Sequence, residues 1–150
     1  MKQTLFDTSK ITVHCDGGSR GNPGPAAVGV VIEYGGMKKK YCETIGYTTN
    51  NVAEYKAVIF ALKKVKQLVG KAKTKAAEIN FYMDSELVVK QLNAEYKIEE
   101  PNLQPLFMEV WNLKFDFGTL RFNYVPREKN READALANKA MDAEDRPRNI

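Results

Sequence analysis

The chain has 150 residues, a formal charge of +4 and an isoelectric point near 9.0. Its composition, 43% hydrophobic and 28% charged residues, is typical of a globular protein rather than a disordered one. The length suits one domain over residues 1–150, with a core at about 10–142 and a frayed tail at about 143–150. This mild basicity is compatible with a nucleic-acid partner but does not require one.

Two features of the sequence predict a soluble protein of the cytoplasm. The N-terminus lacks the apolar segment of a secretory signal, and the longest apolar run, residues 26–32, is too short to span a bilayer. Cys15 and Cys42 are too few for a disulfide framework and lack zinc-site spacing. We therefore expect two half-buried thiols, with Cys42 within reach of solvent, no membrane partner, and a monomer as the default state.

The first third of the chain predicts an antiparallel meander. Apolar and polar residues alternate at about residues 10–16, 26–34 and 38–47, as in half-buried strands. The connections are a Gly/Pro-rich stretch after Asp16 and a short turn at residues 34–36. Both connections are short enough to join neighbouring antiparallel strands.

The rest of the chain alternates helices and strands. A helix starting near Asn50 and Asn51, both good N-cap types, carries an apolar stripe and ends near Gly70. A Lys-rich connection follows it, and the later elements are expected at about 79–83 (strand), 84–92 (helix), 101–111 (helix), 120–125 (strand) and 131–141 (helix). Helical crossovers make the later strands parallel to the first. The ligand site of such an α/β sheet lies beyond the carboxyl ends of its parallel strands.

Four carboxylates occupy positions at element ends where they point partly inward. Asp16 and Asp84 end strands one and four, so parallel neighbouring strands would bring them to one edge of the sheet. Glu54 lies four residues before Val58 on the apolar stripe of its helix, where an unpaired acid is costly. Asp134 begins the last helix on its inward side.

Each acid taken singly has a structural explanation, since Asp is common at helix caps and turns. Together they favour another interpretation, because converging carboxylates repel one another unless divalent cations hold them. Oxygen ligands without His or Cys favour Mg²⁺ or Mn²⁺ over Zn²⁺. Two such ions about 3.5–4 Å apart are a known device for cleaving phosphodiesters.

Four segments, in order, resemble type 1 ribonuclease H: DGGSRGNPGPAAVGVVI, TNNVAEYKAVIFAL, FYMDSELVVKQL and NREADALANKA. The resemblance covers about residues 10–142. It implies an RNase H-like α/β fold, a five-stranded mixed sheet of order 3-2-1-4-5 with helices on both faces. It implies endonucleolytic hydrolysis of the RNA strand of RNA–DNA hybrids, leaving 5′-phosphate and 3′-hydroxyl ends. It also implies two Mg²⁺ or Mn²⁺ ions and, as catalytic metal ligands, Asp16, Glu54, Asp84 and Asp134.

The same resemblance implies where the hybrid binds. The implied substrate contacts come from two segments, with Gly17, Gly18, Ser19 and Asn22 in the first and Thr49, Asn50 and Asn51 in the second. The asparagines match positions near the sugar edges of the hybrid, and Thr49 matches a DNA-phosphate contact. Glycines in the first segment are expected to let the main chain approach the minor groove and read the 2′-hydroxyl.

The sequence departs from many family members at two places. The loop at residues 125–131 lacks their histidine, so Arg127 and Glu128 are the candidates to take its place. The sole histidine, His14, is expected to be a packed or edge strand residue instead. The segment 94–101 is acidic where some members carry a basic, Trp-containing protrusion. The chain thus resembles a short form of the family.

Without that protrusion, hybrid affinity is expected to be weaker or to depend on other lysines. The candidates are surface lysines, namely Lys38, Lys39, Lys40, Lys63, Lys64, Lys71, Lys73 and Lys75. Trp111 is expected in the core with its aromatic neighbours rather than as a base-stacking platform.

Other functions of the same fold stay open at this point. The main alternative is a non-catalytic module that binds hybrid or double-stranded RNA, against which the presence of all four acids argues. A transposase-like or resolvase-like DNA nuclease would lack the glycine-rich turn and the Asn50–Asn51 pair. A proofreading exonuclease would need an acid at Gly18, and no GxGxxG motif supports nucleotide binding. The sequence leaves open whether double-stranded RNA is also cut.

Overall fold

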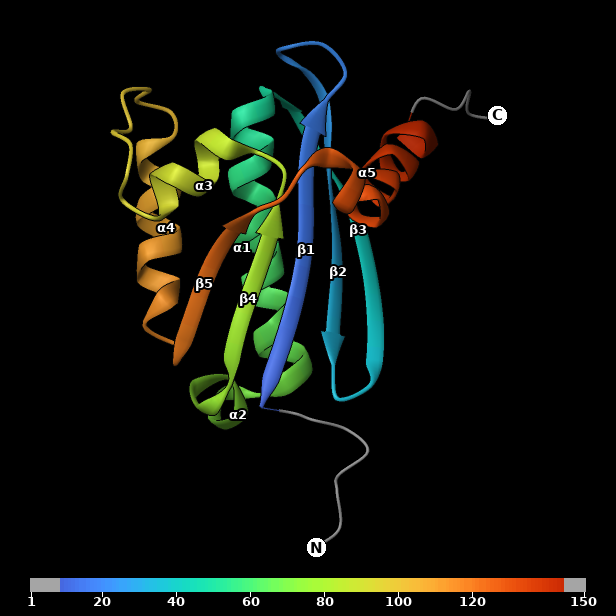
Figure 1. Ribbon diagram of the computed structural model, residues 1–150. Coiled ribbons are helices and arrows are strands. Elements are labelled where there is room, and N and C mark those ends of the chain that lie inside the picture. The colour runs from blue at the N-terminus through green and yellow to red at the C-terminus, as the bar shows by residue number, and fades with distance from the viewer. Residues whose placement is uncertain (1–8, 145–150) are drawn as a thin grey trace, which may run out of the picture.

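The protein is built on one five-stranded mixed sheet of order β3-β2-β1-β4-β5 (Figure 1). The computed structural model describes residues 9–144. Its strands are β1 (Lys10–Ser19), β2 (Gly24–Tyr34), β3 (Met37–Thr48), β4 (Glu78–Met83) and β5 (Thr119–Tyr124). β1, β2 and β3 pair antiparallel, whereas β4 pairs parallel with both β1 and β5. The predicted order and strand directions are confirmed.

Helices cover both faces of the sheet, also as predicted (Figure 1). They are α1 (Asn50–Val69), α2 (Lys71–Ala76), α3 (Glu86–Leu92), α4 (Gln104–Lys114), the 3₁₀ turn η1 (Arg127–Lys129) and α5 (Arg131–Glu144). α1 packs on one face with α4 outside it, while α5 packs on the other face over β2 and β3. Within residues 9–144, no helix is both long and apolar enough to cross a membrane.

The main core fills the space between α1 and the sheet. Tyr55 on α1 is fully buried there, and its hydroxyl donates a 2.8 Å hydrogen bond to Oε1 of Gln91 on α3. Cys15 is fully buried, whereas Cys42 lies exposed on β3, so the half-buried state expected of both thiols is wrong. The expected solvent access of Cys42 is confirmed.

Helix boundaries differ from the prediction at several places. The N-cap of α1 is Thr49, whose Oγ1 accepts a hydrogen bond from the Val52 amide, rather than Asn50 or Asn51. The Lys-rich segment predicted as a connection forms α2, where the buried Thr74 side chain hydrogen-bonds the Gly70 carbonyl oxygen. α5 continues through Glu144, past the predicted start of the tail, and residues 145–150 of that tail lie outside the described residues.

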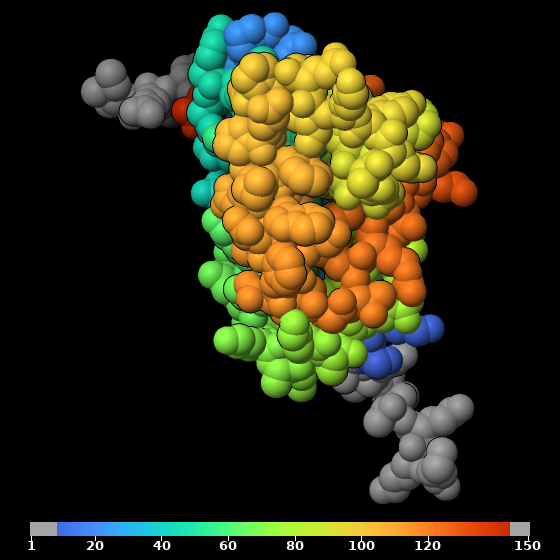
Figure 2. All heavy atoms as spheres, turned by 90° about the vertical axis from the view of Figure 1, so that its left-hand side faces the viewer, coloured from blue at the N-terminus to red at the C-terminus, as the bar shows by residue number. Residues whose placement is uncertain are grey.

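Trp111 lies on the surface, so its predicted place in the core is wrong. α4 contacts α1 along one side, through buried Val110, and its other side forms part of the outer surface (Figure 2). Trp111 on this outer side is 46% exposed, contacts Phe115 edge-on and has Lys114 Nζ 5.5 Å from its ring centre. Apolar residues in α4 therefore occupy more of the helix circumference than the face that packs against the core.

β1 continues three residues beyond the predicted end, through Gly17 and Gly18 to Ser19. A Cβ on Gly17 would lie 2.1 Å from the carbonyl oxygen of Ala53 in α1. Likewise, a Cβ on Gly29 of β2 would lie 2.1 Å from the carbonyl oxygen of Ala133 in α5. The two glycines therefore let α1 and α5 approach the sheet on opposite faces. The glycine at 17 is needed for helix packing, whereas its predicted role at a minor groove stays untested.

We expect Gly17→Ala to lower the free energy of unfolding by about 1–3 kcal/mol, because backbone atoms of α1 must move to admit the methyl group. Gly18→Ala is the matched control, since a Cβ there meets no atom within 4 Å. It should be neutral or slightly stabilising. Urea unfolding of both variants measures the difference, and equal stabilities would contradict the close-packing argument.

Candidate active site

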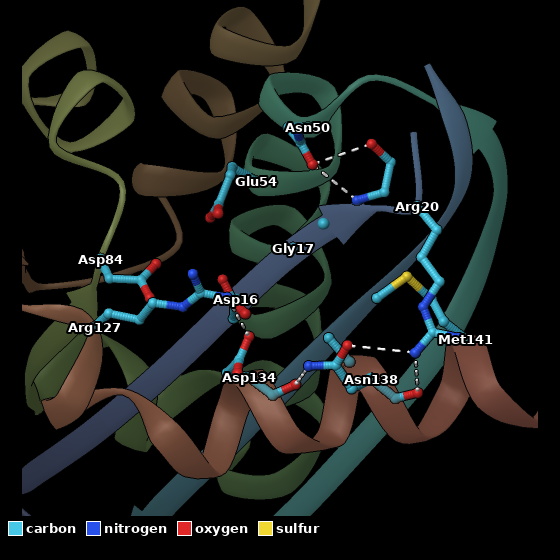
Figure 3. Close-up of a pocket in the computed structure, with 13 residues that line it drawn as sticks. Asp16, Gly17, Arg20, Asn50, Glu54, Asp84, Arg127, Asp134, Asn138 and Met141 are labelled. Carbon is cyan, nitrogen blue, oxygen red and sulfur yellow. Dashed lines mark hydrogen bonds and ion pairs between the residues drawn. The ribbon is translucent and has the colours of Figure 1, made fainter. Parts of the chain in front are cut away.

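The four predicted carboxylates meet in one open cavity of about 410 Å³ at the carboxyl ends of β1 and β4 (Figure 3). The parallel register pairs His14 with Tyr82, so Asp16 and Asp84, each two residues further on, reach the same edge. Glu54 enters from the first turns of α1, and Asp134 enters from the first turn of α5. Sequence positions from the first strand to the last helix thus converge on one site.

Three of the acids lie close together. Asp16, Glu54 and Asp84 each offer a carboxylate oxygen, and these oxygens lie within 4.8 Å of one another. Asp134 faces the same group from α5, with its side chain directed at Asp16 (Figure 3). The site is a compact acidic group with one side open to solvent.

Burial and mutual repulsion strongly perturb this group. Burial, followed by the charges of Asp84 and Asp134, raises the pKa of Asp16 to about 8. Burial and the charge of Asp16 raise the pKa of Glu54 well above its ordinary value. Burial also raises the pKa of Asp84, which the positive charge of Arg127 partly opposes. Ionised together without a counter-charge, these acids destabilise the fold.

The donor set fits a divalent cation of the Mg²⁺ or Mn²⁺ type. All convergent ligands are carboxylate oxygens, which are the donors that such hard cations prefer. Within the described residues, the buried Oε2 atom of Glu54 has no hydrogen-bond partner. A buried carboxylate oxygen without a partner is costly, and a cation among these acids would supply the missing interaction.

Asn130 fixes the start of α5 against β1 and was not singled out from the sequence. Its buried Nδ2 donates a 3.0 Å hydrogen bond to the carbonyl oxygen of Cys15, next to Asp16. Its own carbonyl oxygen accepts from the Asp134 amide at 3.1 Å. Asn130 thereby ties the first turn of α5 to the strand that carries Asp16. An asparagine directly before a helix is the sequence signal that could have identified it.

Comparisons with known proteins agree with this arrangement. A family model described as reverse transcriptase-like matches residues 14–140. Ribonuclease HI of Halobacterium salinarum is 40% identical over 135 residues, which make up 89% of this chain and 65% of that protein. The structure of LC11-RNase H1 in complex with an RNA/DNA hybrid matches with a TM-score of 0.83 and 43% identity, covering 89% of this chain and 98% of that one. The chain belongs to the ribonuclease H-like family.

Some members of the family that match this chain are longer proteins. The bifunctional protein Rv2228c of Mycobacterium tuberculosis is 39% identical over 137 residues, 89% of this chain but 36% of that protein. The solved N-terminal RNase H domain of that protein matches with a TM-score of 0.80 and 38% identity, covering 90% of this chain and 95% of that one. The ribonuclease H-like chain described here thus spans about a third of the length of this relative.

The structure divides the predicted substrate contacts of this ribonuclease H-like chain into two groups. Gly17, Gly18, Ser19 and Asn50 line the cavity, whereas Asn22, Thr49 and Asn51 do not. Of the second group, Asn22 belongs to a hydrogen-bond network around the start of α1, Thr49 caps that helix, and Asn51 Nδ2 donates to Oε1 of Glu100 at 3.4 Å. Asn22 Oδ1 accepts from the Asn50 amide at 3.0 Å, and Asn50 Oδ1 accepts from the Ser19 amide at 2.9 Å. The network joins the β1–β2 turn to α1, and its role in substrate contact stays a prediction.

Arg127 and Glu128 are the two residues predicted to take the place of the loop histidine found in many family members. Arg127 reaches the cavity and Glu128 does not. The Arg127 Nη2 atom lies 3.8 Å from Oδ1 of Asp134. His14 is half-buried in β1 and stacks on Tyr82 with 5.1 Å between ring centres, so its predicted role as a packed strand residue is confirmed.

The cavity is also lined by side chains that the sequence did not identify, Arg20, Ala137, Asn138 and Met141. Within residues 9–144, the lining includes no lysine, so none of the candidate lysines reaches the carboxylates directly. Lys38 and Lys40 instead form ion pairs with Glu132 on α5.

We expect the cation-free protein to lose stability as the pH rises from about 4 to about 8. A folded-state pKa raised above the ordinary 3.8 to about 8 means that the folded protein retains a proton that the unfolded chain has lost. The contribution of Asp16 is therefore complete below pH 4 and is lost as the pH rises through 8. Each such group changes the free energy of unfolding by at most about 1.4 kcal/mol per pH unit.

Urea unfolding in chelator at pH 5–8.5, for wild type and Asp16→Asn, measures this effect. The stability advantage of the variant should grow with pH and shrink when Mg²⁺ is added. Asp116→Asn is the control, because its ion pair with Lys66 lowers the pKa of Asp116 and keeps it ionised over this range. Parallel pH profiles for wild type and Asp16→Asn would disprove the assigned repulsion.

Proposed function

We propose that this protein is an endoribonuclease that hydrolyses the RNA strand of RNA–DNA hybrids. The products would carry 5′-phosphate and 3′-hydroxyl ends. The observation that carries the proposal is the convergence of Asp16, Glu54, Asp84 and Asp134 in one open cavity. The solved complex of a 43% identical ribonuclease H1 with an RNA/DNA hybrid supports the choice of substrate.

The carboxylates of Asp16, Glu54, Asp84 and Asp134 would hold two divalent cations, Mg²⁺ or Mn²⁺. When bound, such a pair stabilises both the attacking and the leaving oxygen of a phosphodiester displacement. The task of the chain itself is to hold the four acids ionised, close together and open on one side. Asn130, Gly17 and Gly29 contribute by fixing α1 and α5 against the sheet.

Arg127 would act on the substrate from the rim of the cavity. Its guanidinium does not lose its proton in proteins, so it cannot relay protons as a histidine does. It can hydrogen-bond phosphate oxygens and favour the ionised form of Asp84, because its charge partly opposes the rise in the pKa of Asp84. We therefore assign it an electrostatic role at the position of the missing histidine.

The main chain at the edge of the cavity is open to direct contact with a substrate. A Cβ on Gly18 would meet no atom within 4 Å, so the main chain there is open to close approach from solvent. Backbone groups of this segment would contact the 2′-hydroxyl groups, which distinguish RNA from DNA. Double-stranded RNA carries the same hydroxyls and is a second substrate to test. The cytoplasmic location and monomeric state stay predictions from the sequence.

Replacing Asp84 by Asn should reduce hybrid cleavage by about 10³-fold or more, because the change removes a cation ligand while keeping the side-chain shape. The assay is a hybrid labelled on its RNA strand, with and without Mg²⁺, beside an all-DNA duplex and double-stranded RNA. Wild-type binding without Mg²⁺-dependent cleavage would instead favour a binding module. Cleavage by Asp84→Asn at the wild-type rate would refute the assigned site.

Arg127→Ala should lower kcat about 10- to 100-fold, since it removes a charged hydrogen-bond donor from the cavity. Glu128→Ala, one residue away and outside the cavity, is the matched control and should change kcat less than about twofold. Steady-state kinetics on the hybrid separates the two variants. Similar losses in both would argue against a specific role for Arg127.

A further inference from the structure

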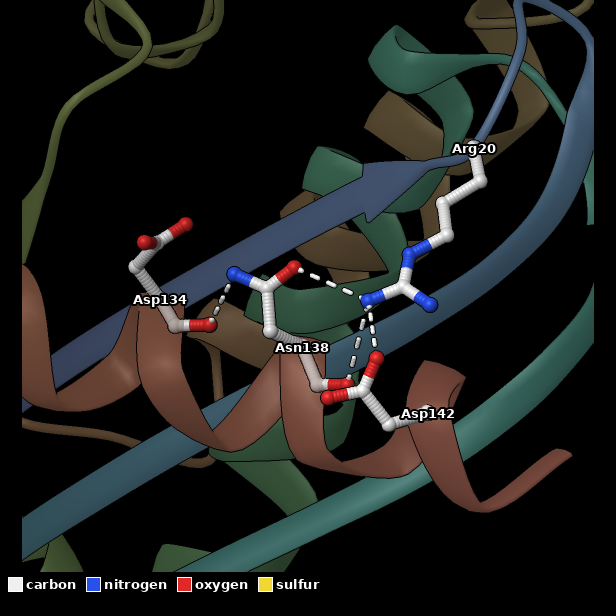
Figure 4. Close-up of polar contacts among 4 residues, drawn as sticks. All are labelled: Arg20, Asp134, Asn138 and Asp142. Atoms are coloured by element: carbon white, nitrogen blue, oxygen red, sulfur yellow. Dashed lines mark hydrogen bonds and ion pairs between the residues drawn. The ribbon is translucent and has the colours of Figure 1, made fainter. Parts of the chain in front are cut away.

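A second guanidinium lies in the cavity at the end distant from Arg127. Arg20, in the turn between β1 and β2, lines the same cavity as the four carboxylates. Its Nη2 atom lies 2.5 Å from Oδ1 of Asp142 and 3.5 Å from both the carbonyl oxygen and Oδ1 of Asn138 (Figure 4). Asn138 Nδ2 in turn donates a 3.0 Å hydrogen bond to the carbonyl oxygen of Asp134. The contacts connect Arg20 to the helix that carries Asp134.

The helix sets the spacing between Arg20 and the acids. Asn138 and Asp142 follow Asp134 by four and eight residues, so they lie about 6 and 12 Å further along the axis of α5. A nucleic-acid strand carries one phosphate per about 3.4 Å of helix axis. A phosphate held at the carboxylates would therefore leave a different phosphate of the same strand near Arg20.

Charge also favours a phosphate at this position. Among the described residues, the cavity lining includes four acids, which repel a polyanion, and two basic residues, Arg20 and Arg127. Arg20 lies away from the acidic group, toward Met141 (Figure 3). Its side chain is 37% exposed, and that of its partner Asp142 is 62% exposed. An ion pair so accessible to water is weak, so a phosphate can compete with Asp142 for the guanidinium.

We propose that Arg20 binds a non-scissile phosphate of the RNA strand, about two to four phosphates from the cleaved bond. Asn138 and Asp142 hold the guanidinium in place before the substrate arrives. The proposal concerns the RNA strand because Arg20 shares its cavity with the acids that would receive the scissile phosphate. It rests on the proposed function, and its test separates the two.

The first measurement is the affinity for hybrid, made in the Asp84→Asn background so that the RNA stays intact. Arg20→Gln should weaken binding about tenfold, as expected for a lost charge-assisted hydrogen bond. It should also reduce the slope of log K against log salt by about one. Arg20→Lys keeps the charge and should recover part of the affinity.

Arg121→Gln is the matched control, because Arg121 also forms an exposed ion pair, with Glu78, at the opposite end of the sheet. It should leave affinity and salt slope unchanged. A loss of affinity for Arg20→Gln no larger than that for Arg121→Gln would overturn the proposal.

The second measurement distinguishes a phosphate contact from a purely structural clamp. A series of hybrids is prepared, each with one RNA phosphate replaced by a methylphosphonate, which carries no charge. The ribose at that linkage carries a 2′-O-methyl group, which keeps the linkage from breaking down. The reference hybrid has the same sugar and an ordinary phosphate. At one position, about two to four phosphates from the cleavage site, the neutral linkage should weaken binding by protein with Arg20 but not by Arg20→Gln. Equal losses for both proteins at every position would show a structural clamp and overturn the proposal.

Failure of the proposed function has a separate signature. Wild-type protein would then leave the unmodified hybrid uncut in Mg²⁺, whatever residue 20 is. If wild type cleaves the hybrid but each methylphosphonate weakens binding equally for wild type and Arg20→Gln, the proposed nuclease activity stands and only the phosphate contact is rejected.

Discussion

Repulsion among converging carboxylates is the constraint on which the rest of the structure depends. Carboxylate oxygens of Asp16, Glu54 and Asp84 lie within 4.8 Å of one another, and burial weakens the solvent screening that would reduce their repulsion. Packing of the helices against the sheet must therefore hold these carboxylates together. Gly17 and Gly29 admit helix backbones so close to the sheet that neither helix can withdraw without opening the core.

The sequence could predict the sheet and the acidic group because their positions follow from local rules. Alternating strands and helical crossovers determine which strands are parallel, and parallel neighbours bring Asp16 and Asp84 to one edge. Glu54 was identifiable because an unpaired acid on the apolar stripe of a helix is costly and therefore indicates a functional role. These inferences need only periodicity and chain order, without knowledge of side-chain contacts.

Other features escaped because they depend on how elements pack. Trp111 has core-like spacing, but α4 lies outside α1 and buries only one side. Gly17 signals a turn in the sequence, and only the approach of α1 reveals the close contact. Arg20 is an ordinary surface cation until the β1–β2 turn brings it against α5. Long-range packing assigns these residues their roles.

The cavity has charges of opposite sign, with Arg127 beside the acids and Arg20 at the end away from them. A nucleic-acid strand entering without cations would meet repulsion at the acids and attraction only at the two arginines. Bound cations would reverse the sign at the acids and make the whole cavity attractive. Cation and substrate would then each raise the affinity for the other, since binding free energies are reciprocal. The same repulsion that costs the free protein stability would thus make binding of a phosphodiester depend on the ions needed to cleave it.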